Sequence, residues 1–276
     1  SQGRGRLALV VYAGDEREGD LPEQLERRGF RVLAVDTARG GRGHDVLRPE
    51  VWKTIVNLVL SGEVACIFMG TPCASYSIAH KPQLRSRRSP EGIPAALAAD
   101  SMWRAYLLKH NRLAELTAEL AGLAHKLGIP WAIENPADRG DKNSLAWWEA
   151  HANHAPLWAM PCMRRLREAT GAGEFTFTQC AFGSETQKWT TIWCANSMNP
   201  ALAPLRARLC AHGRGGHAAV AYGRDAQGVS RAAAAAAYPR ELCAFLSTSF
   251  MHAVVDSECG REGKAGAGNT IIGEGE

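Results

Sequence analysis

The chain alternates between short apolar runs and amphipathic segments, which is the pattern of strands separated by helices. Four apolar-rich runs have the length of strands that are buried on both faces: 7–13, 31–36, 64–69 and 130–135. Helices are predicted between them at 20–28 and 50–60. The first of these has a Pro near its first turn and a Gly just beyond its end.

The clearest helix is predicted at 103–127, where apolar residues recur at helical spacing and form a stripe that we interpret as core packing. Weaker patterns follow along the chain: a short helix at 144–150, paired strands at 176–182 and 188–194, and a helix at 232–248 that Tyr238-Pro239 interrupts. Between 196 and 231 there is no long periodic segment.

The order strand, helix, strand at the start of the chain predicts an α/β fold. We expect a mostly parallel sheet with helices on both faces and a small, irregular C-terminal lobe. The chain then divides into a core at 1–195, the lobe at 196–231, a C-terminal helix at 232–256 and a tail at 257–276. The tail is rich in Gly and charge, so we expect it to be disordered.

The composition is that of an ordinary globular protein, with 46% apolar and 22% charged residues among 276. No apolar run reaches the roughly 20 residues of a membrane span, so no membrane association is predicted. The start at 1–6 is polar and basic without a secretory signal, as in a domain cut from a longer chain. The 8 Cys do not form a disulfide ladder, so we expect an intracellular protein, nuclear in a eukaryote and otherwise cytoplasmic. The net charge of +4 permits a polyanion partner without requiring one.

Reactive side chains close two of the predicted strands. Cys73 follows the strand at 64–69 within Gly-Thr-Pro-Cys, and Glu134 closes the strand at 130–135. The carboxyl ends of parallel strands meet at one edge of a sheet, where open α/β folds place their ligands. A thiolate beside a carboxyl group suits attack on an electron-poor ring, because the acid can donate to a ring nitrogen as charge develops.

Two further features concern ligands. Asp36 closes the second strand, where an acid often bonds a ribose hydroxyl pair; the alternative is a loop cap. The Gly-rich dinucleotide fingerprint is absent, which disfavours a cofactor with two phosphates. The loop at 80–92 is either a solvated surface loop or a mobile, phosphate-seeking flap, which its place beside Cys73 favours. Its cations are Lys81, Arg85, Arg87 and Arg88.

Taken in order, these residues resemble the cytosine-5 DNA methyltransferases over roughly 7–246. The matching set is Tyr12-Ala13-Gly14, Asp36, Asp45, Pro72-Cys73, Glu134-Asn135 and Gln187-Lys188. Pro-Cys alone is a weak signal, whereas Pro-Cys and then Glu-Asn, each closing a strand, is much more specific. The compact form is similar to the methyltransferase-like domains that some eukaryotic retroelements and phages carry.

The resemblance implies a Rossmann-like methyltransferase fold that uses S-adenosylmethionine, which would lie across the first strand ends. The turn Tyr12-Ala13-Gly14 would pass under the methionine part of this cofactor, and Asp36 would hold the ribose. Asp45 would bond the adenine amino group, although it is equally placed to cap the helix that begins near residue 49. Pro72 completes the implied cofactor-binding set.

The resemblance also implies methylation of carbon 5 of cytosine in DNA. Cys73 would attack carbon 6, Glu134 would contact ring N3 and the exocyclic amine, and Asn135 would hold the Pro72-Cys73 loop. The cytosine would leave the duplex to reach the thiol. The implied nucleic-acid contacts are Lys81, Arg85, Arg87, Arg88, Gln187 and Lys188. The lobe at 196–231 would be a reduced target-recognition region, and the helix at 232–256 would pack back on the core.

The chain departs from the family pattern in three motifs: Thr71 stands where the family usually has Pro, Pro136 where it usually has Val, and the third departure is the largest. Where the family has Gln-x-Arg-x-Arg, this chain has Gln187-Lys188-Trp189-Thr190-Thr191, so both arginines that would support a flipped base are missing. Two alternatives therefore stay open: a non-catalytic module that binds nucleic acid or cofactor, and the same chemistry on RNA. A monomer is the default expectation.

Several Cys and His residues of the second half are possible zinc ligands, namely Cys180, Cys194, Cys210, His212 and His217. No paired CxxC motif accompanies them, whereas structural zinc sites commonly contain one. We therefore predict no metal site.

Overall fold

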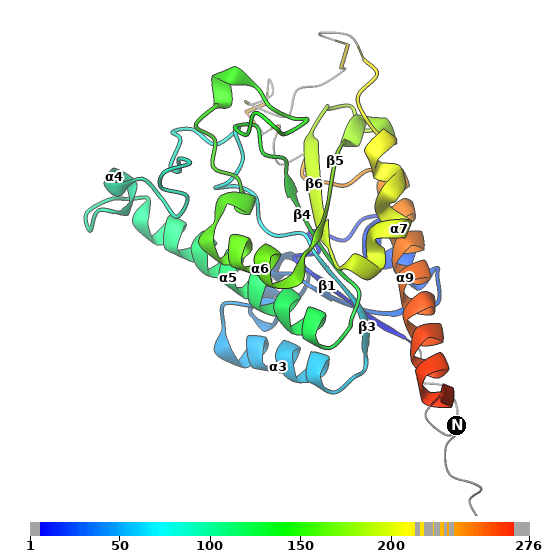
Figure 1. Ribbon diagram of the computed structural model, residues 1–276. Coiled ribbons are helices and arrows are strands. Elements are labelled where there is room, and N and C mark those ends of the chain that lie inside the picture. Colours follow the sequence, from blue (N-terminus) through cyan, green and yellow to red (C-terminus); the bar gives the residue numbers. More distant parts are fainter. Residues whose placement is uncertain are drawn as a thin grey trace, which may run out of the picture.

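The computed structural model describes residues 6–212, 216–217, 223, 227–228, 231 and 235–267, with side chains as far as 259. Six strands form one sheet in the order β2-β1-β3-β4-β6-β5 (Figure 1). They are β1 (Leu7–Val11), β2 (Arg31–Val35), β3 (Val64–Met69), β4 (Trp131–Pro136), β5 (Gly173–Thr178) and β6 (Trp189–Cys194). The α-helices are α1 (Leu21–Glu26), α2 (Thr37–Gly40), α3 (Pro49–Leu60), α4 (Pro94–Leu97), α5 (Arg104–Lys126), α6 (Pro161–Thr170), α7 (Asn199–Leu202) and α9 (Arg240–Ala267). The short 3-10 helices are η1 (Gly41–His44), η2 (Glu149–His151), η3 (Leu157–Ala159), η4 (Gln179–Phe182), η5 (Asn196–Met198) and η6 (Ala203–Ala207).

The sheet is mostly parallel, as the continuous apolar runs predicted. Strand β1 pairs in parallel with β2 and β3, and β3 pairs in parallel with β4. Strand β6 is antiparallel to both β4 and β5, so it runs against the rest of this sheet. The paired strands that we expected around Gly183 are therefore present as β5 and β6.

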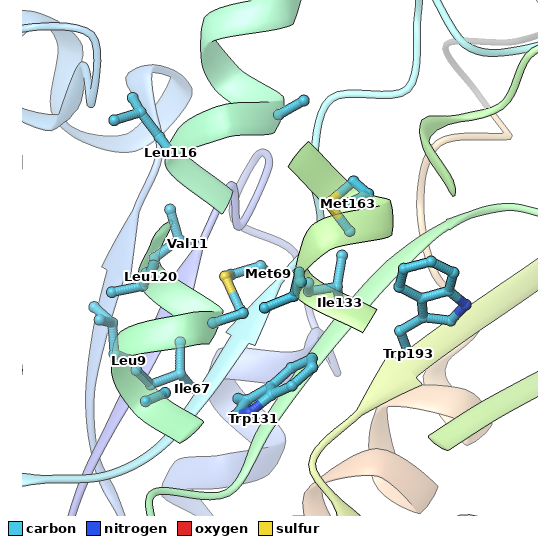
Figure 2. Packing of buried hydrophobic residues seen from close by; sticks show 14 of the residues in the cluster. Leu9, Val11, Ile67, Met69, Leu116, Leu120, Trp131, Ile133, Met163 and Trp193 are labelled. Atoms are coloured by element: carbon cyan, nitrogen blue, oxygen red, sulfur yellow. The ribbon is translucent and has the colours of Figure 1, made fainter. Parts of the chain in front are cut away.

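One face of the sheet packs against α3, α5 and α6, which lie together on one side in Figure 1. Alternate residues of each central strand point to this face, as the period of a strand requires. Figure 2 shows this cluster, in which the side chains of the strands meet those of α5 and α6. Its labelled members are Leu9, Val11, Ile67, Met69, Leu116, Leu120, Trp131, Ile133, Met163 and Trp193.

The intervening residues of the same strands point to the opposite face. Ala8 and Val10 of β1 and Phe68 of β3 pack there against α1 and α9, and the residues of β5 and β6 extend the cluster to α7. Helices therefore cover both faces of the sheet, which confirms the predicted layer arrangement. Two cores, one on each side, hold the strand ends in fixed positions.

The strand order reverses between β1 and β3. The chain runs from β1 outward to β2 and then returns across β1 to reach β3. At such a switch point the connections leave neighbouring strands in opposite directions, and open α/β sheets bind ligands outside these carboxyl ends. The turn that begins at Tyr12 follows β1, and the loop that contains Cys73 follows β3.

Several predicted elements differ from the structure. The strand predicted at 176–182 ends at Thr178 and is followed by η4, and the C-terminal helix α9 begins only at Arg240. Segment 144–150 forms turns and the start of η2, because the side chains of Asp141 and Ser144 bond nearby backbone N–H groups and so compete with a helix. Helix α9 continues past 256 to Ala267, where we predicted disorder. The side chain of Arg6, just before β1, binds both carboxylate oxygens of Glu258 and holds this part of the helix.

Much of the predicted lobe lies outside the described residues, as do 268–276 of the predicted tail. The described part of the lobe forms η5, α7 and η6, which pack against β5 and α9. Within the described part of the chain, no helix is both long enough and apolar enough to cross a membrane.

The packing of α5 yields a test of the fold. Leu120 is 1% exposed in the core, whereas Leu108 on the same helix is 46% exposed. Leu120→Ala is expected to lower the free energy of unfolding by about 2–5 kcal/mol, because it leaves a cavity. Leu108→Ala is expected to change it by no more than about 0.5 kcal/mol. Urea unfolding of both variants measures the difference, and equal effects would contradict this account of the core.

Candidate active site at the carboxyl edge of the sheet

The turns after β1 and β3 lie side by side at the carboxyl edge of the sheet. The N–H of Gly70 donates to the carbonyl of Val11 over 3.1 Å, and the N–H of Tyr12 donates to the carbonyl of Val35 over 2.8 Å. A Cβ on Gly70 would lie 3.0 Å from the Tyr12 carbonyl oxygen and 2.9 Å from the Tyr238 hydroxyl. Glycine is therefore needed where β3 ends, because the neighbouring chain segments approach so closely.

Cys73 lies three residues beyond Gly70 and is partly exposed. The carbonyl of Cys73 accepts a hydrogen bond of 2.9 Å from the N–H of Tyr76, so the thiol belongs to a defined turn. Burial raises the pKa of the Cys73 thiol above its ordinary value; the Lys188 cation opposes this shift and the Glu134 carboxylate adds to it. The charges of Lys188 and Glu134 thus act on Cys73 although the three residues are far apart in sequence.

Glu134 is a buried acid at the end of β4, with only 5% of its surface exposed. Its Oε2 atom accepts a hydrogen bond from the Tyr238 hydroxyl. Its Oε1 atom is also buried and has no partner among the described residues. Buried carboxylate oxygens are nearly always hydrogen-bonded. The free Oε1 is therefore suited to a ligand that brings a hydrogen-bond donor to the carboxylate, or an acceptor to the protonated acid.

Asn135 is fully buried beside Glu134 and points into the loop after β3. Its Nδ2 donates to the carbonyl of Thr71 over 2.7 Å, one residue before Pro72. The hydroxyl of Thr71 in turn lies 3.1 Å from that of Thr117 on α5. These bonds connect the Cys73 loop to β4 and to the core helix, so the loop is held on two sides.

In the sequence, Tyr238 stands out only as an interruption of a predicted helix, and we predicted no role for it in a site. Pro239 precedes the first residue of α9, so Tyr238 lies outside the helix and turns toward the sheet. Its ring packs edge-on against Phe68 at 6.0 Å, and Lys188 Nζ lies 5.3 Å from the ring centroid. Burial and the Glu134 carboxylate raise the pKa of Tyr238, so its hydroxyl stays protonated and serves as a donor. In the sequence, the only indication of this role was that Tyr238-Pro239 interrupts a helical pattern.

The predicted cofactor residues lie at the ends of β1 and β2. Asp36 accepts bonds of 2.9 Å from the N–H groups of Gly14 and Ala38, so it caps α2 and also braces the turn after β1. Tyr12 has a left-handed backbone with φ of 60°, which turns the chain sharply after the strand. Asp45 accepts a bond of 3.1 Å from the N–H of Leu47 and lies in a local turn. Ala13 and Pro72 are both partly exposed at this edge.

Arg39 is a second residue that the sequence analysis missed. Its Nε donates to the Gly14 carbonyl over 2.8 Å, and its guanidinium pairs with Asp20, the N-cap of α1. Asp20 is only 4% exposed. The turn at Gly14 is therefore held by Asp36 on one side and Arg39 on the other, in place of a Gly-rich loop.

The prediction that Arg85 meets nucleic acid is wrong for this conformation, because Arg85 is 2% exposed. Its guanidinium donates to Ser75, to the Pro90 carbonyl over 2.6 Å and to Asn111 over 2.8 Å. It also lies 4.1 Å above the Tyr76 ring. Arg85 thus anchors the loop to the protein and is not available to a phosphate.

The other predicted nucleic-acid residues differ in how far they are engaged. The Nη1 atom of Arg87 donates to both carboxylate oxygens of Asp138, at 2.8 and 2.9 Å. Lys81 and Arg88 are exposed, and neither side chain bonds another residue in the described ranges. Gln187 is partly exposed and approaches Cys210, and Lys188 lies beside Cys73 and Tyr238.

A pocket lies between the loop at 80–92 and the segment 150–155. It is lined by Ser77, His80, Lys81 and His151, among others.

The comparisons with known proteins add little to this geometry. No family model and no curated protein matches the chain. Among solved structures it is similar to a prophage-encoded E. coli protein assigned as a DNA modification methyltransferase, with a TM-score of 0.35 and 12% identity. The match covers 68% of this chain and 46% of that one, so the chain spans less than half of its length. The site must therefore be judged on its own contacts.

The charges around Cys73 predict a pH dependence. Alkylation by iodoacetamide requires the thiolate, so the rate at Cys73 is expected to rise with pH through a midpoint above that of an ordinary cysteine. Lys188→Met removes a favourable cation and should move the midpoint higher. Glu134→Gln removes an opposing carboxylate and should move it lower. Mass spectrometry of the Cys73 peptide measures both shifts.

Exposed Cys259 serves as an internal reference in the same samples. The pH profile of alkylation at Cys73 could coincide with that of Cys259 in the wild type and in both variants. That result would show that neither charge acts on the Cys73 thiol.

The buried state of Arg85 predicts a large loss of stability on its removal. Arg85→Met leaves Ser75, Asn111 and the Pro90 carbonyl without their donor, which is expected to cost at least about 2 kcal/mol of unfolding free energy. Arg88→Met, at an exposed position of the same loop, should change it by less than about 0.5 kcal/mol. Denaturant unfolding measures both changes. If Arg85→Met lowers the unfolding free energy no more than Arg88→Met does, Arg85 is a surface cation and is again available to a phosphate.

Proposed function

We propose that the protein methylates carbon 5 of cytosine in DNA with S-adenosylmethionine as the methyl donor. The observation that carries this proposal is that a partly exposed thiol, Cys73, and a buried acid, Glu134, lie at one sheet edge, and that Oε1 of Glu134 lacks a partner among the described residues. The motif resemblance supplies the reaction class. The sheet topology supports it, because Cys73 follows β3, which borders the switch point, and Glu134 lies near the end of the neighbouring strand β4.

The cofactor would lie across the ends of β1 and β2. Asp36 supports this placement because its carboxylate oxygens, each with one backbone donor, keep further lone pairs for a ribose hydroxyl pair. The turn at Tyr12-Ala13-Gly14 would pass beneath the methionine part, held by Asp36 and Arg39. The bound cofactor supplies an electrophilic methyl group.

Attack by Cys73 on carbon 6 of the ring would begin the reaction. A bond forms between sulfur and carbon 6, and the displaced electron pair moves to carbon 5. Lys188 favours the thiolate needed for this step, because its cation lowers the pKa of the thiol. Glu134 would meet N3 and the exocyclic amine through the free Oε1, while Tyr238 holds its other oxygen in place.

The later steps follow from the same adduct. Carbon 5 would take the methyl group, with S-adenosylhomocysteine as the leaving group. A base would then remove the proton from carbon 5, and the electron pair would expel the Cys73 thiolate. Asn135 would act as a positioning residue, because its bond to the Thr71 carbonyl fixes the loop that carries the nucleophile.

The nucleic-acid side of the proposal rests on few cations. Lys81, Arg88 and Lys188 are the members of the predicted set whose charged groups are at least partly exposed and make no hydrogen bond or ion pair among the described residues. This small supply favours a non-catalytic module as the second candidate, because Lys188 cannot replace both arginines that would support a flipped base.

A covalent-trapping experiment tests the reaction. The full chain is incubated with S-adenosylmethionine and duplex DNA in which 5-fluorocytosine replaces cytosine throughout one strand. Fluorine on carbon 5 cannot leave as a proton does, so the adduct is expected to persist through denaturing electrophoresis. Cys73→Ala should abolish it, whereas Cys162→Ala, which removes a comparably exposed thiol on α6, should retain it.

Three other outcomes are informative. Binding of S-adenosylmethionine without any adduct would support the non-catalytic module. An adduct only with matched 5-fluorocytosine RNA would move the same chemistry to RNA. An adduct that survives Cys73→Ala would rule out this thiol as the nucleophile.

A further inference from the structure

Four metal-ligating side chains that are scattered in the sequence come together beside the end of β5. They are Cys180, Cys210, His212 and His217, and their ligand atoms all lie within 4.8 Å of one another. Cys180 is buried, Cys210 and His217 are partly exposed, and His212 faces solvent. A metal ion therefore has a route in from the surface.

The spacing of the donor atoms is close to that of a tetrahedral site. Zn–S bonds of about 2.3 Å and Zn–N bonds of about 2.0–2.1 Å place tetrahedral ligands about 3.3–3.8 Å apart. The Cys210 sulfur lies 3.6 Å from His212 Nδ1 and 3.2 Å from His217 Nε2. The widest pairs, at up to 4.8 Å, need to contract by only about 1 Å around an ion.

The backbone brings the two halves of the cluster together. The N–H of Thr178 donates to the Arg208 carbonyl over 3.0 Å, which sets the end of β5 against the segment after η6. The Arg208 guanidinium lies 5.1 Å from the centroid of the Phe182 ring, on η4. Cys180 and Cys210 are thus neighbours although thirty positions separate them in the sequence.

We propose that Cys180, Cys210, His212 and His217 bind a structural zinc ion. Two thiolates and two imidazoles form a donor set that zinc accepts in tetrahedral geometry, and four protein ligands leave no position open for a substrate. The two thiolates would neutralise the ion, and their protons would be released on binding. The proposed site departs from our prediction of no metal site: in place of the missing CxxC pair it would use Cys180 from η4 and Cys210 from the lobe.

Cys194 was the fifth candidate in the sequence and does not belong to the cluster. It is buried in β6, where its sulfur lies 3.5 Å from Asn199 Oδ1.

The proposed ion has a structural consequence near the candidate active site. It would clamp 208–212 and His217 to the end of β5, and Gln187 approaches Cys210 on the side next to β6. Lys188 is next in sequence to Gln187 and acts on Cys73. The ion would therefore stabilise the part of the lobe that borders the site, whatever reaction the site performs.

Metal analysis of the full chain tests this proposal. Protein that is purified without chelator is expected to carry about one zinc ion per chain by mass spectrometry of the metal. Cobalt substitution should give the visible absorption of a tetrahedral ion and a thiolate-to-cobalt band. Cys210→Ser and His217→Asn should lose the metal. Cys259→Ser and His252→Asn, which remove exposed residues of the same types on α9, should retain it.

A chelator should lower the unfolding temperature of the wild-type chain and leave that of Cys210→Ser unchanged, since the ion stabilises the folded state alone. A wild-type chain that remains without metal in the presence of zinc, or one that forms a Cys180–Cys210 disulfide under conditions that keep the other thiols reduced, would overturn the proposal. Neither readout involves methyl transfer, so failure of the zinc site and failure of the proposed reaction are distinguishable.

Discussion

The hydrogen bond from Tyr238 to Glu134 is the contact on which the candidate site depends. A carboxyl group buried at a sheet edge is costly unless its oxygens find partners, and here a residue 104 positions away supplies one of them. The bond joins β4 to the segment that leads into α9. The C-terminal part of the chain must therefore dock on the sheet before Glu134 is held in place, which makes α9 part of the site as well as part of the core.

The rest of the edge is built on the same plan, with turns fixed by buried polar contacts between elements. Asn135 reaches from β4 to the loop after β3, and Asp36 reaches from β2 to the turn after β1. Arg39 and Asp20 complete that turn. Because two packed cores hold the strands, these short bonds set the positions of Cys73 and Gly14 without long loops or a Gly-rich motif.

The basic loop after Cys73 shows how packing changes the meaning of a charge pattern. Arg85 is used inside the protein and Arg87 is paired with Asp138, so half of the loop's cations serve its own structure. The attraction of a protein for nucleic acid grows with the number of cations that reach phosphates. The modest net charge of +4 and these internal pairings both indicate a small electrostatic contribution to the binding of any polyanion.

The sequence by itself determined the layered α/β architecture, because apolar runs and helical stripes reflect local burial that any fold of this chain must satisfy. It also located Cys73, Glu134 and Asn135 at strand ends. Tertiary structure alone decided which polar groups meet: that Tyr238 holds Glu134, that Arg85 is buried, and that Cys180 joins Cys210, His212 and His217. These contacts link residues far apart in the chain, and no local periodicity records them. Segment 144–150 is not the predicted helix for a local reason, since the side chains of Asp141 and Ser144 bond nearby backbone N–H groups in competition with helical hydrogen bonds.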